Sequence, residues 1–369
     1  MKNFKRVSVD KENKCEACSA ADFNNDGKIE IVCGEYMYSG HDFSTKTKIC
    51  DIKYNGDYLE DFSDYPLDVN GDGYPDIITG SWWSEGIFWR ENPGKAGGLW
   101  KTHKITDCTN VETIRYFDID NCGTAEIFPN CPGEPQFFLK LVKDQNNRPS
   151  GKFEKYQIQA GAQNAGHGMG FGDINGDGRA DIILANGWLE QPENAYSPDW
   201  KFHDDFKDFN VPGTCVPMLV HDVNGDGVND LIVGAGHGFG LWWFEQKINA
   251  AGGREFIRHD IDLVCSQYHD MQLFDIDGDG EPELITGARY FAHCGHDPGE
   301  LNPIGSYIFK IKKTPAGVMV FDRHTLDYGP AESASGLGIY FWLEDLNGSG
   351  YKDIVAPGKE GLYIFYNNH

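Results

Sequence analysis

The feature that most constrains this chain is a nine-residue pattern that occurs seven times. The stretch HGMGFGDINGDGRADIILANGW, residues 167–188, contains it as D-x-N-x-D-G-x-x-D from Asp173 to Asp181. The seven copies cover residues 22–30, 68–76, 118–126, 173–181, 222–230, 275–283 and 345–353. Their first aspartates are 46 to 70 residues apart, which leaves room for several short strands in each unit. The repeat predicts a seven-bladed β-propeller, because a solenoid usually has a shorter and stricter period.

Strand-like segments surround each copy of the pattern. An apolar, β-branched run (182–184) follows the loop at 173–181, where an EF-hand would continue as a helix. Residues 241–244 illustrate the aromatic third strand of a unit, and the alternating segment 256–261 illustrates its fourth. The last unit stops after its third strand, whereas residues 4–9 have the fourth-strand pattern. We therefore expect one all-β domain over residues 1–369, closed by pairing of residues 4–9 with the blade of residues 345–366.

The loops themselves have the composition of sites for hard cations. Side-chain oxygens stand at positions one, three, five and nine, and a glycine at position six allows a sharp turn. We expect Ca²⁺ or Mg²⁺ there, bound weakly or not at all where Cys122 and Ser349 occupy position five. The predicted ligands are Asp22, Asn24, Asp26, Glu30, Asp68, Asn70, Asp72, Asp76, Asp173, Asn175, Asp177, Asp181, Asp222, Asn224, Asp226, Asp230, Asp275, Asp277, Asp279 and Glu283.

Composition excludes several classes of partner. The formal net charge of −25 argues against nucleic acid as a partner, and acidic cation loops account for much of it. No apolar stretch is long enough to span a membrane, and the N-terminus has no signal-peptide core. The ten cysteines follow no paired pattern, so we expect free thiols and a cytoplasmic location. The sequence does not indicate an oligomeric state.

Hairpin geometry predicts which residues reach the central channel. The two strands around a loop fold back on each other, so residues about ten before and ten after its fifth position lie at the opposite end of the blade. The first strand of a propeller blade is the innermost, so that end opens on the channel. Before the loops, these offsets select Glu16, Phe62, Glu112, His167 and His269 among others. After the loops they select Glu35, Trp82, Trp83, Asn186, Trp188, His237, Arg289, Tyr290 and Lys359.

These residue types favour acid–base chemistry on a carbohydrate. We expect His167, His269 and His237 to transfer protons, with Tyr290 as an acid and Arg289, or a divalent metal held by the channel histidines, stabilising an enolate. We expect the substrate to contact Trp82, Trp188, Asn186, Glu35, Lys359 and His293, the last within a long insertion at 289–304. The chain has no G-x-S-x-G, Walker or dinucleotide motif. Nucleophilic and redox chemistry are therefore less favoured than acid–base elimination.

Two resemblances add to this reading. The seven loops resemble the FG-GAP or VCBS repeats of integrin-type propellers. Three segments resemble the propeller domain of the aldos-2-ulose (1,5-anhydrofructose) dehydratases and their bacterial relatives: GHGMGFGDINGDGRADIILANGWLEQP, GAGHGFGLWWFEQ and SQYHDMQLFDIDGDGEPELITGARYFAHCGHDPGELNP.

The second resemblance implies a lyase that eliminates water from a small ketosugar in the channel, with divalent cations in the loops. It implies functional roles for His167, His237, His269, Arg289, Tyr290 and His293. The sequence ends at His369, so we expect no counterpart of the additional C-terminal domains of the fungal enzymes. A glycoside as leaving group, a polysaccharide lyase of the propeller type and a non-catalytic FG-GAP module that binds carbohydrate or protein are the alternatives.

Overall fold

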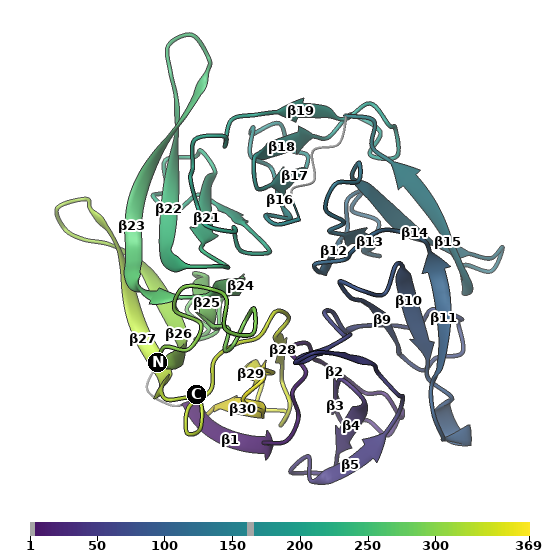
Figure 1. Ribbon diagram of the computed structural model, residues 1–369. Coiled ribbons are helices and arrows are strands. Elements are labelled where there is room, and N and C mark those ends of the chain that lie inside the picture. The colour runs from purple at the N-terminus through teal and green to yellow at the C-terminus, as the bar shows by residue number, and fades with distance from the viewer. Residues whose placement is uncertain (1–3, 161–165) are drawn as a thin grey trace.

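In the computed structural model, which describes residues 4–160 and 166–369, seven four-stranded antiparallel sheets form a ring (Figure 1). Each sheet is one blade, and its first strand lies nearest the centre. A 3₁₀ turn at Gly94–Ala96 is the one helical element of the described residues. This arrangement confirms the predicted seven-bladed propeller.

The first four blades consist of the following strands, given from the centre outward. They are β2 (Ser19–Ala21), β3 (Glu30–Cys33), β4 (Tyr36–Ser39) and β5 (Thr45–Lys48); β8 (Tyr65–Leu67), β9 (Asp76–Gly80), β10 (Ile87–Glu91) and β11 (Lys101–Thr106); β12 (Ile114–Phe117), β13 (Glu126–Pro129), β14 (Phe137–Lys143) and β15 (Pro149–Gln157); β16 (Gly170–Gly172), β17 (Asp181–Leu184), β18 (Gly187–Glu190) and β19 (Lys201–His203).

The other three blades follow the same order. They are β20 (Leu219–His221), β21 (Asp230–Gly234), β22 (Phe239–Ile248) and β23 (Arg254–Ser266); β24 (Tyr268–Phe274), β25 (Glu283–Ala288), β26 (Ile304–Lys313) and β27 (Met319–Gly329); β28 (Trp342–Glu344), β29 (Asp353–Ala356), β30 (Leu362–Asn367) and β1 (Phe4–Asp10). A small hairpin of β6 (Tyr54–Asn55) and β7 (Tyr58–Leu59) lies between the first two blades in sequence.

The ring closes through its two terminal strands. Strand β1 pairs antiparallel with β30, with Phe4 opposite Asn367 and Ser8 opposite Tyr363. The N-terminal strand thereby becomes the outer strand of the last blade, as predicted, and both chain ends lie at this blade (Figure 1). Because β1 covers the edge of β30, the last blade has the same four strands as the others.

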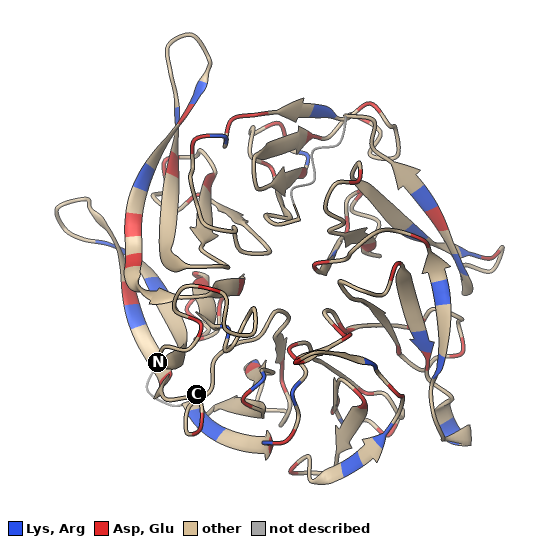
Figure 2. Cartoon of the chain, viewed as in Figure 1, with Lys and Arg blue, Asp and Glu red and all other residues tan. Residues whose placement is uncertain are grey.

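The burial of each strand explains its pattern of apolar and polar residues. The second strands are fully buried apolar segments such as Asp181–Leu184 and Asp230–Gly234, since neighbouring blades cover both of their faces. The outer strands alternate between partly buried and exposed positions, and they carry many of the charged side chains (Figure 2). The described part of the chain contains no helix of the length and apolar character needed to cross a membrane.

Three blades repeat one contact between their third and fourth strands. A tryptophan on the third strand stacks on a histidine of the fourth, and that histidine also contacts a glutamate of the third. The sets are Trp89, His103 and Glu91; Trp188, His203 and Glu190; and Trp243, His259 and Glu245. These outer histidines therefore have a structural role within each blade.

The seven acidic loops lie at the ends of the blades away from the central side-chain cluster described below. In the loop at 173–181, Asp173 accepts hydrogen bonds from the backbone N–H groups of Asp177 and Gly178. The buried Asp181 accepts from the N–H groups of Ile174 and Gln191, so it joins the loop to the third strand of its blade. Hydrogen bonds of this kind hold the side-chain oxygens of the loop in place.

Three of the loops also contact a lysine of their own third strand. Lys310 lies on the carboxylates of Asp277 and Asp279, Lys140 lies 3.0 Å from Asp120, and Lys247 lies 3.2 Å from Asp226. Part of the negative charge that the sequence concentrates in these loops is therefore offset by the protein itself.

Candidate functional site

A pocket of about 290 Å³ lies at the centre of the ring, at the ends of the inner strands. One wall is aromatic and consists of Tyr58, Phe62, Trp82 and Trp83. The ring of Trp83 packs 5.0 Å from that of Tyr58 and 6.0 Å from that of Phe62, measured between centroids. The opposite wall is polar and consists of Glu112, His167, Arg289 and His293. An aromatic face opposite convergent polar groups suits a sugar ring.

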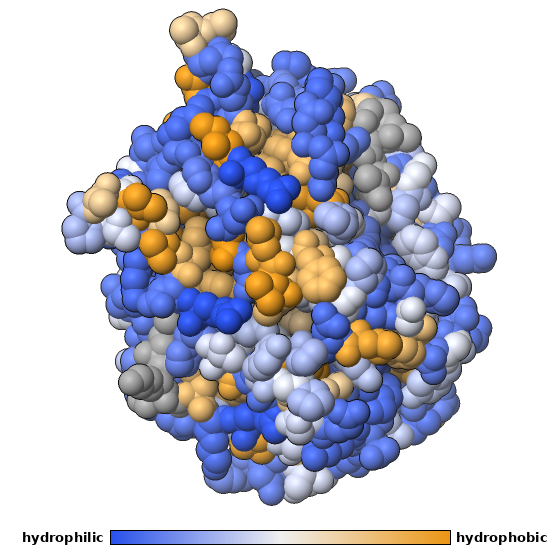
Figure 3. Space-filling model, turned by 60° about the vertical axis from the view of Figure 1, so that its left-hand side comes forward, coloured by the Kyte–Doolittle hydropathy of each residue, from blue (hydrophilic) through white to orange (hydrophobic). Residues whose placement is uncertain are grey.

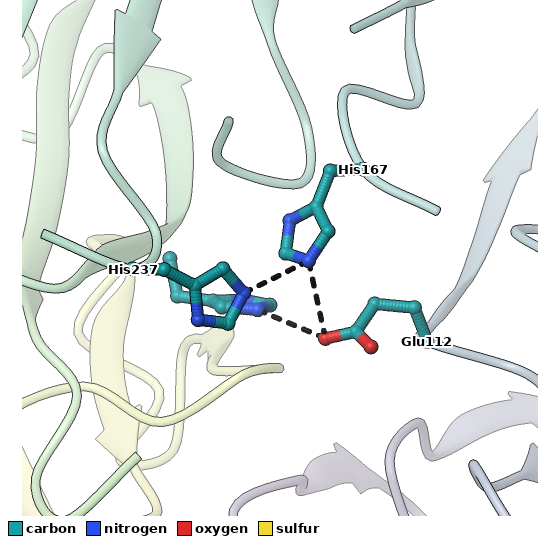
Figure 4. Close-up of side chains that lie close together, drawn as sticks. Glu112, His167 and His237 are labelled. Atoms are coloured by element: carbon teal, nitrogen blue, oxygen red, sulfur yellow. Dashed lines mark hydrogen bonds and ion pairs between the residues drawn. The ribbon is translucent and has the colours of Figure 1, made fainter. Parts of the chain in front are cut away.

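Glu112 and three imidazoles meet at the polar wall (Figure 4). The Nε2 atoms of His167 and His237 are 2.9 Å apart. Glu112 Oε1 lies 3.8 Å from His167 Nε2 and 3.2 Å from His269 Nε2. His269 is fully buried and reaches Glu112 from behind the pocket wall. The four side chains come from four successive blades, so the cluster forms only when those blades are assembled around the axis.

Two glycines allow the close approach of His167 and His237. Gly168 has a φ of +97°, and a Cβ there would lie 2.2 Å from the backbone nitrogen of Ala185. A Cβ on Gly213 would lie 2.1 Å from the His237 ring. Any larger residue would push either imidazole from its place.

The insertion between β25 and β26 supplies a further part of the site. Asp297 Oδ2 lies 2.7 Å from His237 Nδ1 and 3.0 Å from His293 Nδ1. The two imidazole rings stack with centroids 4.2 Å apart. One carboxylate thus orients two imidazoles, of which His293 lines the pocket.

Burial governs the charges of the cluster. It lowers the pKa of His237 to about 4, with His167 adding to the effect, and it lowers the pKa of His269 well below the ordinary value. Burial also opposes ionisation of Glu112, but the hydrogen bond from His269 and the nearby imidazoles outweigh it, so the pKa of Glu112 lies well below its usual range. At neutral pH the cluster is therefore one carboxylate surrounded by imidazoles, with His237 and His269 neutral.

A buried ion pair lies beside the pocket. Arg289 donates through Nε to Glu16 Oε1 at 2.7 Å and through Nη2 to Glu16 Oε2 at 3.2 Å. Its Nη1 is buried and has no hydrogen-bond partner within residues 4–160 and 166–369. Lys359 donates to the backbone oxygen of Phe291 at 2.8 Å and holds the insertion against the ring. Arg289 lines the pocket and has one guanidinium nitrogen that is not engaged by Glu16.

Five of the predicted site residues are not among the described residues that line this pocket. Trp188 packs inside its blade on His203, with its indole nitrogen on Asp205, and Asn186 before it lines no part of the pocket. Tyr290 packs beside Ala288 and Ile304, and Glu35 accepts from the Ile52 N–H. Lys359 likewise holds the insertion rather than lining the pocket.

Other residues join the site that the offsets did not select. Tyr58 comes from β7, in the long connection between the first two blades. The length of that connection is the feature of the sequence that could have indicated a residue of the site. Asp297 lies in the insertion, whose dense histidines marked it as functional in the sequence. Glu112, although selected by the offsets, was not assigned a role.

A buried carboxyl near the Glu16 pair gives a pH prediction. Burial raises the pKa of Glu360 from 4.5 to about 7, although the Gly336 N–H donates to it. The native state keeps this proton while the unfolded chain releases it, so stability falls as the pH rises from 4.5 through about 7. Glu360→Gln should remove that loss and stabilise the protein by up to about 3 kcal/mol at pH 8 but not at pH 4. Thermal melts from pH 4 to pH 8 measure this, and the exposed Glu332→Gln is the control. A difference that does not grow with pH contradicts the prediction.

A larger hollow of about 850 Å³ lies on the outside of the ring, between the projecting hairpins β22–β23 and β26–β27. Its walls include Trp243, Val318 and Phe321, and apolar side chains reach the surface on this side of the molecule (Figure 3). It lacks the convergent imidazoles of the central pocket, so the central pocket is the better functional site.

Comparisons with known proteins concern the fold. No family model and no curated protein matches the sequence. A solved structure of BBS1N in complex with ARL6DN, soaked with mercury, is similar over 98% of this chain and 95% of that chain, with a TM-score of 0.54 and 10% identity. A Bacillus licheniformis rhamnogalacturonan lyase matches 99% of this chain and 76% of its own, with a TM-score of 0.47 and 12% identity.

At these identities, the first likeness shows a shared fold alone, and the second supports no inference about activity. The resemblance to FG-GAP repeats and to aldos-2-ulose dehydratases remains a prediction from the sequence. What the comparison and the blades establish together is that the chain folds as a seven-bladed β-propeller.

Proposed function

We propose that the protein is a carbon–oxygen lyase that eliminates water or a glycosidic alcohol from a small ketosugar in the central pocket. The observation that carries the proposal is the pocket itself, with an aromatic wall facing imidazoles, a carboxylate and an arginine. The aromatic wall matches the flat face of a sugar ring, and the polar wall supplies groups that move protons and stabilise negative charge.

The roles of the residues follow from their positions. His293 lines the pocket, and Asp297 holds its Nδ1, which leaves Nε2 as the basic atom that removes the proton α to the ketone. The C–H electron pair forms an enolate, which the positive charge of Arg289 in the pocket wall stabilises. Collapse of the enolate breaks the β carbon–oxygen bond, and the leaving oxygen takes the proton that His293 removed, which gives water or an alcohol and an enone and restores the neutral imidazole. His167 faces His237 and supports the wall of the pocket.

The proposal also includes a cytoplasmic location and a structural role for the acidic loops. All ten cysteines lack disulfide partners, which supports a reducing, cytoplasmic environment. We assign Ca²⁺ or Mg²⁺ in the acidic loops a structural role, because the loops lie away from the pocket and are already ordered by internal hydrogen bonds.

Turnover of 1,5-anhydrofructose and of 3-keto-glucosides, followed by enone absorbance, tests the proposal. His293→Ala should lower kcat/KM by about 10²–10⁴, because it removes the general base. His259→Ala is the matched control, since that imidazole stacks on Trp243 outside the pocket and should leave kcat/KM unchanged. Enone formation by the His293 variant at the wild-type rate contradicts the assignment, and cleavage of uronic-acid polymers in place of ketosugars contradicts the substrate class.

A further inference from the structure

We propose that the opposite end of the central channel holds a second small-molecule site, which binds a neutral pyranose ring independently of the central pocket. A cavity of about 400 Å³ lies there. Tyr65, Gln272 and Trp342 line it, and each stands three residues before the first aspartate of an acidic loop. Asp118, which also lines the cavity, is itself such an aspartate. The cavity therefore lies at the loop end of the blades, away from the imidazoles.

Arg115 lies between the two cavities. It stands on β12, three residues after Glu112, which corresponds to about 10 Å along an extended strand. Glu112 lines the central pocket, whereas Arg115 lines the second cavity. The guanidinium reaches across the axis, where Nη2 donates to the backbone oxygen of Val216, just before β20, and to Asp270 Oδ1 on β24 at 3.0 Å. One arginine thus joins three blades and divides the channel.

Aromatic side chains from three blades form much of the second cavity. Tyr65 lies on β8, Tyr116 on β12 and Trp342 on β28, and the last two strands border the centre of the ring (Figure 1). The rings of Tyr65 and Tyr116 stack with centroids 3.5 Å apart and an interplanar angle of 9°. The Trp342 ring lies 6.2 Å from that of Tyr65 at an angle of 65°. The aromatic walls are therefore tilted and do not face each other in parallel.

The tilt of these walls indicates the shape of the ligand. A flat aromatic molecule stacks best on one face or between two parallel faces. A pyranose chair is saturated and carries C–H groups on its faces and around its edge, so it can contact two aromatic walls that meet at an angle. The volume of about 400 Å³ is in the range of about 300–1,000 Å³ that is usual for ligand pockets.

The lining also contains polar atoms without partners. Tyr116 Oη, Trp342 Nε1 and Arg115 Nε are buried, and none has a hydrogen-bond partner within the described part of the chain. Buried polar atoms are normally paired, because an unpaired donor costs about 1–3 kcal/mol. All three atoms belong to side chains that line this one cavity. The wall therefore has unused hydrogen-bonding capacity for a ligand that carries hydroxyl groups.

The charges around the cavity favour a neutral ligand. Arg115 is the one cationic side chain among the described residues that line it, and Asp270 already balances its charge. The guanidinium also lies 4.9 Å from the centre of the Tyr340 ring, so it occupies a position that a cationic ligand would need. Asp118 in the lining repels a phosphate or a carboxylate. A neutral sugar ring therefore suits the cavity better than a nucleotide or a quaternary ammonium.

Fluorine NMR of the full chain labelled with 5-fluorotryptophan tests this site without an assay of activity. Trp342→Phe, Trp82→Phe and Trp83→Phe assign the resonances of the second cavity and of the central pocket. The labelled protein is titrated with the methyl pyranosides of glucose, galactose and rhamnose to about 10 mM, ten times a Kd of about 1 mM. We expect at least one of them to shift the Trp342 resonance. Mannitol, an acyclic polyol, should leave it in place because it has no ring to pack on the aromatic walls.

Tyr65→Leu should weaken the binding that shifts Trp342 by about 10-fold, because it removes one aromatic wall. Tyr328→Leu is the matched control, since that ring is 58% exposed on β27 and lines neither cavity, and it should bind the sugar like the wild type. Circular dichroism confirms folding. Gln272→Ala, at a partly exposed position of the lining, should also weaken binding and serves in case Tyr65→Leu does not fold.

A Trp342 resonance that no pyranoside moves overturns the proposal, as does an equal shift with mannitol. Shifts confined to Trp82 and Trp83 place sugar binding in the central pocket alone and likewise overturn it. His293→Ala should retain the Trp342 shift, because that imidazole lines the other cavity. Loss of turnover in this variant with the shift intact separates the lyase proposal from this one.

Discussion

Removal of residues 1–9 is expected to lower the melting temperature by about 10 °C and to make the protein associate. Strand β1 covers the whole length of β30, and its loss would expose a buried strand edge at the point where the ring closes. The lost ladder hydrogen bonds and the burial of Phe4 and Val7 are together worth on the order of 5 kcal/mol. An open edge of this kind pairs readily with a second chain.

Calorimetry and size-exclusion chromatography measure this effect. Lys5→Ala is the matched control, because that side chain is exposed on the same strand and should leave stability within about 0.5 kcal/mol. A shortened chain that melts at the wild-type temperature as a monomer would show that β1 does not hold the ring closed.

Arg289→Met is expected to destabilise the protein by about 3–5 kcal/mol, because it leaves the Glu16 carboxylate buried without its bidentate partner. The pair joins the sixth blade to the first, across the ring closure. Burial opposes the charge of Arg289, but the opposite charge of Glu16 outweighs this, so the pKa of Arg289 is raised and the guanidinium remains charged. Chemical denaturation measures the loss.

A double substitution separates the effect of the unpaired buried charge on stability from the effect of the lost side-chain packing. Glu16→Gln combined with Arg289→Met should recover part of the lost stability, since both charges of the pair are removed, while Lys359, 3.7 Å from Glu16, keeps its hydrogen bonds to backbone oxygens. Arg323→Met removes an ion pair with Asp262 in which the arginine is partly exposed, and should cost less than about 1 kcal/mol. Equal losses from Arg289→Met and Arg323→Met would contradict the role of the buried pair.

Much of the fold was predictable because its signals are local in the sequence. Each acidic loop needs its oxygens and its glycine within nine residues, and each flanking strand shows its period within a few more. The closure by β1 was predictable because one unit lacked a fourth strand and the other end of the chain supplied it. The offsets from the loops also placed Glu112, His167, His237 and His269 at one end of the blades. Residues at equal distances from a hairpin loop lie opposite each other, because antiparallel strands pair in a fixed register.

The direction of a side chain at the end of a strand was not predictable in this way. Trp188 lies in β18 opposite Ile183 and packs into its blade, whereas Trp82 follows β9 in a turn and faces the pocket. A shift of one residue along a strand moves a side chain to the other face, so offsets counted to within one residue do not decide this. The same reason applies to Tyr290 and Glu35, which the offsets selected but which are not among the described residues that line the pocket.

The sequence alone thus determined the propeller, its closure and the end of the ring at which polar residues gather. Only the tertiary structure decided which of those residues meet. Tyr58 and Asp297 come from long connections whose paths depend on packing, and the orientation of His167 depends on a backbone oxygen 47 residues away in the chain. The physical reason is that strand register is set by neighbours in sequence, whereas the contacts at the axis join residues from different blades, which approach one another only after the ring has closed.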